Sequence, residues 1–269
     1  MHKSASDFFI AFLAINFLSH LLRYALFAGI GFFIWRRARH ASSGLRKIQP
    51  KTPDRTQIRR ELIRSVLAFA IFTAVGFVTL LLVFNHVIPP TKIYGNIHQY
   101  SLLYFFFSIG ALIIWHDTYF YWAHRLMHDK RVFHFTHRVH HLSTNPNPLS
   151  AYAFNSVESV IEALGITAFI FVMPINVWAL FIFYFVAAAV TVYGHIGVEL
   201  YPTYWAKHSI GRWINTAVAH DFHHQTAKHN YGIYFLFWDR LMGTLDQDYE
   251  SRFECFARRP TGQHSHIPI

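Results

Sequence analysis

Long apolar segments set the strongest limit on what this chain can fold into. Three of them, at residues 8–35, 66–88 and 101–122, are long enough as helices to cross a hydrocarbon layer of ~30 Å. Two shorter segments, at 157–173 and 177–193, meet at the sequence MPIN, which is typical of a turn between paired helices. Only 14% of the residues are charged, against about 25% in soluble domains. The sequence therefore predicts one all-α integral membrane helical bundle, with about three spans plus a helical hairpin.

Lysine and arginine are unevenly spread, and their distribution predicts the orientation of the chain. Residues 36–65 contain ten of them, whereas residues 86–100 contain only Lys92. Since basic loops remain in the cytoplasm, the first loop is expected to be cytoplasmic. The third span returns to that side, so residues 123–156 and 194–269 are expected there too. Orientation and attraction to anionic lipids account for the net charge of +10, and nucleic-acid binding is not expected.

Two features of the spans are assigned to the membrane rather than to a function. His20 and Arg23 fall near the middle of the first segment, where charge is costly. We expect a tilted or broken segment with Arg23 extending toward the surface; the alternative is a functional role. Aromatic residues around the histidine-rich stretch at 124–141 are expected to form an interfacial belt, with a substrate tunnel as the alternative: Tyr119, Phe120, Trp122, Phe133, Tyr152 and Phe154.

The segments expected in the cytoplasm hold more histidines than packing requires. Six fall within residues 124–141, and the spacing of HRVHH at 137–141 recurs in HDFHH at 220–224. On a helix, side chains four residues apart are separated by only about 40° around the axis, and adjacent ones by about 100°. His140 and His141 therefore diverge and can serve two neighbouring ions. One HxxxH and two HxxHH groups supply eight imidazoles, too many for one tetrahedral ion. We predict a two-metal site, and the single Cys255 excludes a cysteine-based one.

Three more residues are candidates for the same site. Asp117 precedes His124 by seven residues on one helical stripe, so its carboxylate can accept a hydrogen bond from a ligand imidazole; the alternative is pairing with a cation such as Arg125. His195 follows the hairpin and is either a ligand or an ordinary interfacial residue. Glu199, one turn later, is a ligand, a support for a ligand, or a solvated charge. His229 is a weaker candidate ligand.

These motifs resemble the fatty acid hydroxylase superfamily, which includes sterol desaturases, C4-methylsterol oxidases and sphingolipid hydroxylases. The resemblance rests on D-x3-Y-x2-H-R-x2-H at 117–128, on HRVHH and HDFHH, and on NPNPLSAYAFNSVE, GHIGVELYP and NYGIYFLFWDRLMGT. It covers about residues 110–250 and implies a membrane di-iron oxygenase. The implied metal ligands are His124, His128, His137, His140, His141, His195, His220, His223 and His224.

The resemblance also divides the chain and exposes two departures from the family pattern. Residues 1–100 are expected to supply N-terminal spans and the basic loop, residues 101–250 the catalytic domain, and residues 251–269 a tail. Some relatives have a second histidine where Glu199 stands, and many have a histidine where Asn155 stands. The roles of these two positions are therefore left open.

The implied reaction is O2-dependent hydroxylation or desaturation of a C–H bond in a sterol, sphingoid or fatty-acyl lipid. Two iron ions are the implied cofactors, with zinc possible in purified protein, and Asp117 and Glu199 are the candidate catalytic carboxylates. The chain lacks a G-x-G-x-x-G fingerprint and an HPGG haem motif, so an external donor resembling cytochrome b5 or a ferredoxin is expected. The alternatives are a zinc transporter or a non-catalytic zinc-binding membrane protein. The final HSHIPI shows no obvious retrieval signal, which favours a bacterial inner membrane over the endoplasmic reticulum.

Overall fold

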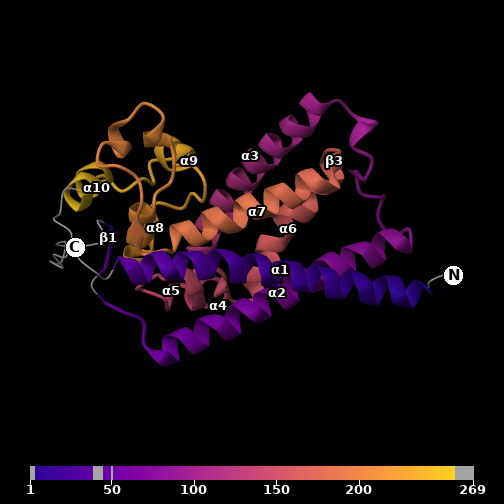
Figure 1. The fold of residues 1–269 in the computed structure, drawn as a ribbon, viewed down its shortest axis with the longest axis horizontal. Helices are drawn as coiled ribbons and strands as arrows, with labels where there is room; N and C mark the ends of the chain where they lie inside the picture. Colours follow the sequence, from indigo (N-terminus) through magenta and orange to yellow (C-terminus); the bar gives the residue numbers. More distant parts are fainter. Residues whose placement is uncertain (1–3, 39–44, 50, 258–269) are drawn as a thin grey trace.

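The computed structural model describes residues 4–38, 45–49 and 51–257, which are mainly helical (Figure 1). The long helices are α1 (Ala5–Arg37), α2 (Arg55–Phe84), α3 (Leu102–Met127), α6 (Ser156–Val172) and α7 (Val177–Gly194). The shorter ones are α4 (Phe133–Thr136), α5 (Arg138–His141), α8 (Ala217–Thr226), α9 (Phe237–Leu241) and α10 (Tyr249–Ala257), with 3-10 turns η2 (Ile97–Gln99), η3 (Pro148–Tyr152), η4 (Trp205–Lys207) and η5 (Gly211–Trp213). The predicted all-α helical bundle is confirmed. Arg39, and HSHIPI within the expected tail, lie outside the described residues.

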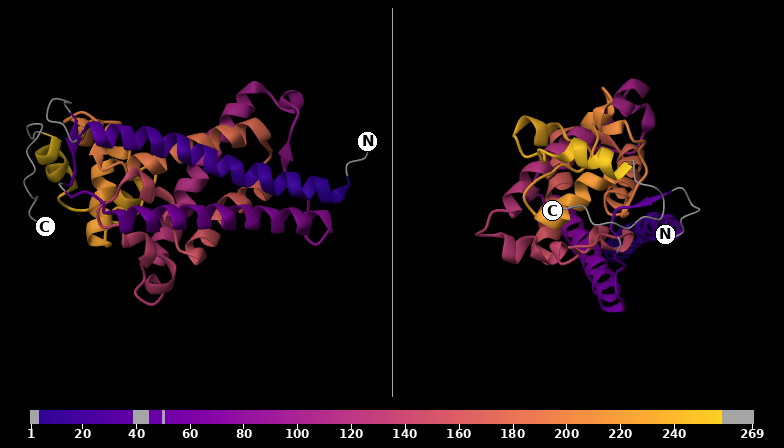
Figure 2. Two further views of the ribbon diagram at one scale, coloured as in Figure 1. Left: turned by 60° about the horizontal axis from the view of Figure 1, so that its bottom comes forward. Right: turned by 90° about the vertical axis from the view of Figure 1, so that its left-hand side faces the viewer.

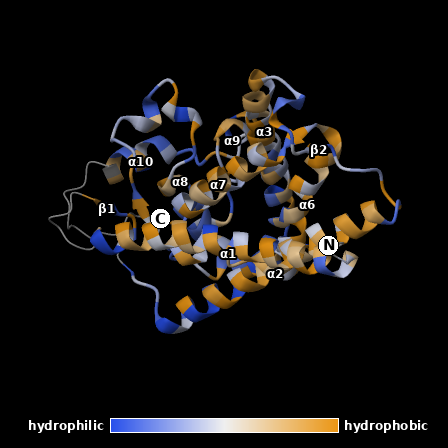
Figure 3. Ribbon diagram, turned by 45° about the vertical axis from the view of Figure 1, so that its right-hand side comes forward, coloured by the Kyte–Doolittle hydropathy of each residue, from blue (hydrophilic) through white to orange (hydrophobic). Residues whose placement is uncertain are grey.

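Four helices in the described part of the chain are long and apolar enough to cross a membrane, namely α1, α2, α3 and α7. Their outer faces carry large exposed apolar side chains, such as Leu22, Ile30 and Phe33 on α1. Figure 3 shows α1 and α2 as mainly hydrophobic along their lengths. Because soluble proteins rarely expose apolar surfaces of this extent, we expect these faces to contact lipid.

The hairpin between α6 and α7 forms where the sequence predicts it. Pro174 lacks an N–H group and disfavours a helical conformation of the residue before it, and Met173 is extended. Ile175–Asn176 then forms the short strand β3, which pairs in parallel with β2 (Ile93–Tyr94). The Asn176 side chain accepts a hydrogen bond from the Trp178 amide at 2.9 Å and starts α7. Local sequence thus determines both the break and the restart.

The basic segment 36–65 differs from the expected loop, because much of it is helical. α2 begins far ahead of its apolar part, since the Asp54 carboxylate accepts a hydrogen bond from the Gln57 amide at 2.7 Å and caps the helix. The linker between α1 and α2 contains β1 (Arg46–Lys47), which pairs antiparallel with β4 (Val198–Glu199). The linker is therefore attached to the segment that follows α7.

The short helices gather in the half of the molecule away from the N-terminus (Figures 1 and 2), while α1 and α2 run side by side along its length. A core between α3, α6 and α7 contains Leu112, Phe169 and Phe183. A second core packs Trp35 of α1 against Phe222 of α8 and the α10 aromatics. α8 contributes Phe222 to the second core and also carries His220, His223 and His224.

Close packing between α3 and α6 yields a test of the bundle. A Cβ atom at Gly165 would overlap the ring of Tyr119, whose hydroxyl donates to the Ile161 carbonyl at 2.7 Å and so holds the ring in place. Overpacking of this kind costs ~1–3 kcal/mol. We expect Gly165→Ala to lower the melting temperature of detergent-purified protein, measured by circular dichroism.

Gly110→Ala is the matched control on α3, because nothing lies within 4 Å of a Cβ atom placed there. Alanine favours a helix over glycine by ~1 kcal/mol, so this variant should melt no lower than the parent. Equal melting temperatures for the two variants would contradict the packing assigned to the α3–α6 contact.

Candidate metal centre

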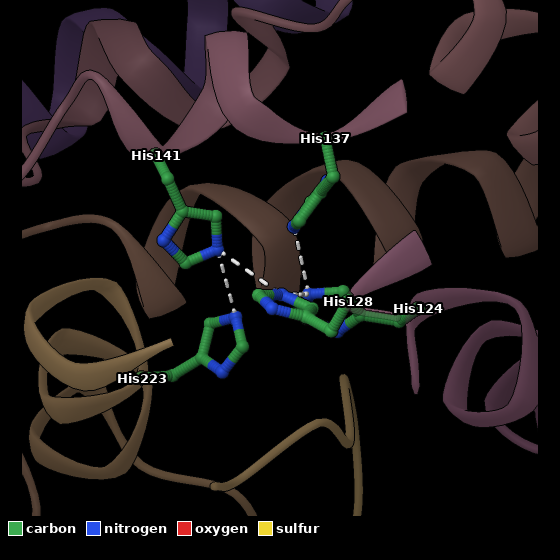
Figure 4. A group of neighbouring side chains, drawn as sticks. All are labelled: His124, His128, His137, His141 and His223. Atoms are coloured by element: carbon green, nitrogen blue, oxygen red, sulfur yellow. Dashed lines mark hydrogen bonds between the residues drawn. The ribbon is translucent and has the colours of Figure 1, made fainter. Parts of the chain in front are cut away.

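Nine histidines from separate segments converge in two adjacent groups. The first histidine group contains His124, His128, His137, His141 and His223, and the second contains His140, His195, His220 and His224. Within each group, one ring nitrogen of every histidine lies within 4.8 Å of the others. Figure 4 shows the rings of the first group directed toward one another. These are the nine histidines that the sequence analysis nominates; their role as ligands remains a prediction.

Helix geometry distributes neighbouring histidines between the groups. His140 and His141 are adjacent at the end of α5, and the divergence of their side chains places one in each group. On α8, His220 and His224 are four residues apart and share the second group, whereas His223 points to the first. The two repeats of the HxxHH spacing thus bridge both groups, which lie close enough for the His141 and His224 rings to stack at 4.9 Å.

The separations between ring nitrogens fit a metal coordination shell. The Nε2 atom of His124 lies 2.9 Å from that of His137, and the His141 and His223 Nε2 atoms are 3.1 Å apart. In the second group, His195 Nε2 lies 3.0 Å from His220 Nε2. Metal–imidazole bonds of ~2.0–2.1 Å place neighbouring ligand nitrogens about 2.9–3.4 Å apart in octahedral or tetrahedral geometry.

The other ring nitrogens determine the tautomer. Nδ1–H of His124 donates to the Tyr231 carbonyl at 2.8 Å, Nδ1–H of His223 to the His229 carbonyl at 2.7 Å, and Nδ1–H of His195 to the Thr191 carbonyl at 2.8 Å. Because a carbonyl oxygen only accepts, these imidazoles carry their proton on Nδ1, and each neutral ring leaves a bare lone pair on Nε2. Lone pairs that converge in this way repel each other unless a cation lies between them.

Burial favours the neutral form that metal binding needs. Removal from water, together with the neighbouring imidazoles, lowers the pKa of His140, His223 and His224 well below its ordinary value. A neutral imidazole binds a metal without first losing a proton. The residues present therefore fit two metal ions, one in each histidine group.

A cavity opens from the histidines into the bundle. His124, His137, His140, His195 and His220 contribute to its lining, and apolar side chains including Phe69, Ile166, Phe183 and Ala187 form much of the rest. Its volume is about 170 Å³, larger than the ~150 Å³ engineered cavity that binds benzene. An apolar cavity with a few polar groups is typical of a small-molecule site.

The cavity corrects two assignments made from the sequence. Arg23 does not extend to the surface: α1 is continuous, Arg23 is 8% exposed, and it lines the cavity together with His20. Of the aromatic residues expected in an interfacial belt, Phe120, Tyr152 and Phe154 line the cavity instead. Tyr119 and Trp122 line a separate apolar pocket, and Phe133 packs beside the His128 ring at 5.3 Å.

The family model for fatty acid hydroxylases matches residues 109–244, which include all nine histidines. The chain belongs to the fatty acid hydroxylase family.

Three proteins similar to this chain have names that describe the oxidation of sterols. A Delta(7)-sterol 5(6)-desaturase of Gibberella zeae is 28% identical over 191 residues, covering 71% of this chain and 56% of that protein. The human lathosterol oxidase is 26% identical over 193 residues, covering 71% and 62%. A putative methylsterol monooxygenase of Dictyostelium discoideum is 27% identical over 206 residues, covering 77% and 74%. The chain spans about six tenths of the first two relatives, and no solved structure matches it significantly.

Asp117 of the family motif does not contact a histidine of either group. Its carboxylate accepts hydrogen bonds from the backbone amides of Tyr234 and Phe235 at 2.9 and 3.1 Å. The expected hydrogen bond from a ligand imidazole is thus wrong, because seven residues place Asp117 about 10 Å below His124 along α3. The alternative of pairing with Arg125 is not observed either, since Arg125 donates to the Tyr121 hydroxyl and lies over Trp122. Asp117 positions the segment whose Tyr231 carbonyl holds His124.

Glu199 also lies outside both histidine groups. One carboxylate oxygen accepts from the Tyr193 hydroxyl at 2.7 Å and the Tyr201 amide at 2.9 Å, and the other from the Val218 amide at 3.0 Å. The carboxylate is buried, and removal from water raises its pKa. Glu199 is therefore neither a ligand nor a solvated charge in this structure, and it holds the start of α8, which carries His220. His229 likewise contributes its backbone carbonyl to His223 rather than its ring.

The sequence analysis missed Glu158, which contacts the first histidine group directly. Its Oε1 atom accepts from His137 Nδ1 at 2.7 Å, and its Oε2 atom accepts from the Asn155 amide at 3.2 Å. Asn155 caps α6 and so has a structural role here. The spacing Asn-x-x-Glu at the start of an apolar helix is the signal that predicts this reciprocal cap.

Replacing Glu158 tests the support of the first group. A carboxylate behind a ligand imidazole raises its basicity, and its loss typically costs 10–100-fold in metal affinity. We expect Glu158→Gln to weaken metal retention by about that factor, measured by chelator competition on purified protein. Glu162→Gln is the matched control one turn away, because Glu162 Oε1 has no hydrogen-bond partner among the described residues. Unchanged retention in Glu158→Gln, or an equal loss in both variants, would contradict this role.

Proposed function

We propose that the chain is a membrane-bound, O2-dependent enzyme that hydroxylates or desaturates a lipid C–H bond at two iron ions. The observation that carries this proposal is the cavity, because an apolar space opens directly onto the converging histidine nitrogens. A carbon held there would lie beside both metal positions. The names of the relatives, a desaturase, an oxidase and a monooxygenase, all describe oxidation of a lipid.

The choice of iron follows from the reaction rather than from the donor atoms. Imidazole suits iron, zinc, copper and nickel, so nine histidines alone do not select a metal. Iron supplies the redox change that activates O2 toward an unactivated C–H bond, which zinc cannot supply. The first histidine group would hold one ion and the second group the other, with Glu158 supporting His137.

The protein's own part in this reaction is positioning and exclusion of water. The carbonyls of Thr191, His229 and Tyr231 fix imidazole orientation, so the metal positions are set before substrate arrives. Aromatic and aliphatic walls hold the lipid chain and keep water from the reacting carbon. Hydroxylation and desaturation then differ only in how the carbon is placed relative to the ions.

The proposed orientation puts the histidine end of the bundle in the cytoplasm. The basic residues at the end of α1 and the start of α2 support it by the positive-inside rule. A bacterial inner membrane remains our preferred location. On the cytoplasmic face, the basic residues would steer an acidic electron donor such as a cytochrome b5 or a ferredoxin. Residues 101–250 would form the catalytic domain, with residues 1–100 adding two spans and a cavity wall, and residues 251–269 as a tail.

The two alternatives fit the observations less well. A zinc transporter needs a path for cations, but Arg23 places a positive charge inside the cavity that such a path would use. A protein that binds zinc without turnover needs no apolar cavity beside its ligands. Both alternatives predict a redox-inert protein.

Metal analysis with group-specific variants tests the proposal. We expect about two iron ions per chain in untagged protein from iron-supplemented cells, measured by mass spectrometry. His223→Ala in the first group and His220→Ala in the second should each lower the iron content and abolish O2-dependent lipid oxidation, because each removes a ligand from a different ion. Membrane insertion should be unchanged. Retained oxidation in both variants, or a purified protein that binds no metal, would refute the proposal.

A further inference from the structure

Arg23 is a buried cation with no counter-ion among the residues that the structure describes. It lies near the middle of α1, is 8% exposed and lines the cavity. Its guanidinium lies 5.1 Å from the centre of the Tyr184 ring on α7, and its Nη2 atom donates to His20 Nδ1 at 3.2 Å. Among the described residues, no carboxylate lies within ion-pair distance of Arg23.

Such an arrangement is costly unless it serves a ligand. A cation away from water is destabilising when it is not paired, and ionisable residues inside membrane spans mark functional sites. A guanidinium has five donors and no acceptor, so one bond to His20 leaves most of its donors open to the cavity. His20 accepts that bond on Nδ1 and therefore keeps a proton on Nε2 as a further donor. Among the described residues, Arg23 forms no hydrogen bond besides the one to His20 and no ion pair.

The rise per residue along α1 and α7 gives the distance between Arg23 and the second histidine group. Tyr184 precedes His195 by eleven residues on α7, which corresponds to about 16 Å along the axis. On α1, a Cβ atom at Gly31 would lie 3.1 Å from Val192 Cγ1, close to His195 in the chain. Gly31 follows Arg23 by eight residues, or about 12 Å. Both helices place Arg23 roughly 12–16 Å from the second histidine group.

We propose that Arg23, supported by His20, is a specificity-determining residue that binds an acceptor oxygen at the end of an elongated lipid. A carboxylate would neutralise the charge of Arg23 and accept its hydrogen bonds. A hydroxyl would accept a hydrogen bond but leave the charge unpaired. The inference rests on the proposed function and deepens it, since the oxidised carbon then lies far from the bound oxygen. Arg23 fixes which carbon of the lipid reaches the metal positions.

Head-group-selective binding tests this assignment without turnover. The full chain in detergent, without reductant, would be titrated with radiolabelled stearate, stearyl alcohol and octadecane, which share one chain length. Stearate should bind about 10- to 100-fold more tightly than octadecane, as for a hydrogen bond to a charged group, with the alcohol between them. Arg23→Met should remove this preference and leave octadecane binding unchanged. Arg64→Met, on α2 and absent from the cavity lining, should behave as the parent.

Two further variants keep the test decisive if Arg23→Met does not fold. Arg23→Lys retains a charged donor and should keep a reduced preference for stearate, whereas His20→Phe should weaken that preference. An equal loss of all three ligands would show a purely structural role and overturn the proposal, as would a parent protein that binds the three equally. Lipid oxidation without an Arg23-dependent preference refutes this inference alone. A preference in a protein that binds no metal refutes the proposed function alone.

Discussion

The convergence of bare imidazole nitrogens in a buried place is the constraint on which the rest of this structure depends. Nitrogen lone pairs such as those of His124 and His137, whose Nε2 atoms are 2.9 Å apart, repel in a medium of low dielectric constant. The fold holds four of these rings by giving the Nδ1–H groups of His124, His137, His195 and His223 fixed acceptors. Those acceptors are mostly backbone carbonyls, so the orientation of the rings depends on how firmly the surrounding loops are held.

Buried carboxylates and amides hold those loops. Asp239 accepts from the amides of Tyr231 and Gly232 at 2.9 and 2.8 Å, and Asn230 donates to the Ala219 carbonyl of α8 at 3.0 Å. Glu61 of α2 accepts from Ser143 and Asn147 in the loop after α5. A layer of polar side chains therefore lies behind the histidines on several sides. Asp239 and Asn230 bond to backbone groups, and Glu61 bonds to the Ser143 and Asn147 side chains, so these groups act through position and would be poor candidates for direct chemistry.

The sequence predicts features that follow from residue spacing within one helix, and it misses contacts between different elements. The apolar segments predict the spans, and the HxxHH spacing predicts that His140 and His141 belong to different groups. Asp117 follows the same helical stripe as His124, yet the seven residues between them correspond to about 10 Å along the axis, too far for a hydrogen bond. Glu158 contacts His137 from a different helix, which no spacing within one element reveals. The start of α2 lies within a strongly basic stretch, so the hydropathy pattern does not reveal it and only the Asp54 cap signals it.

Arg23 shows most clearly why a span cannot be interpreted alone. Within α1, a single charge among apolar residues predicts a side chain that reaches toward the surface. The contact with Tyr184, from α7, reverses that prediction. α7 also ends at His195 in the second histidine group, so one rigid helix connects the cation to the metal positions. If a lipid is anchored at Arg23, the distance along α7 from Tyr184 to His195 determines which of its carbons lies beside the histidine groups. That distance is set by helix geometry rather than by a flexible loop.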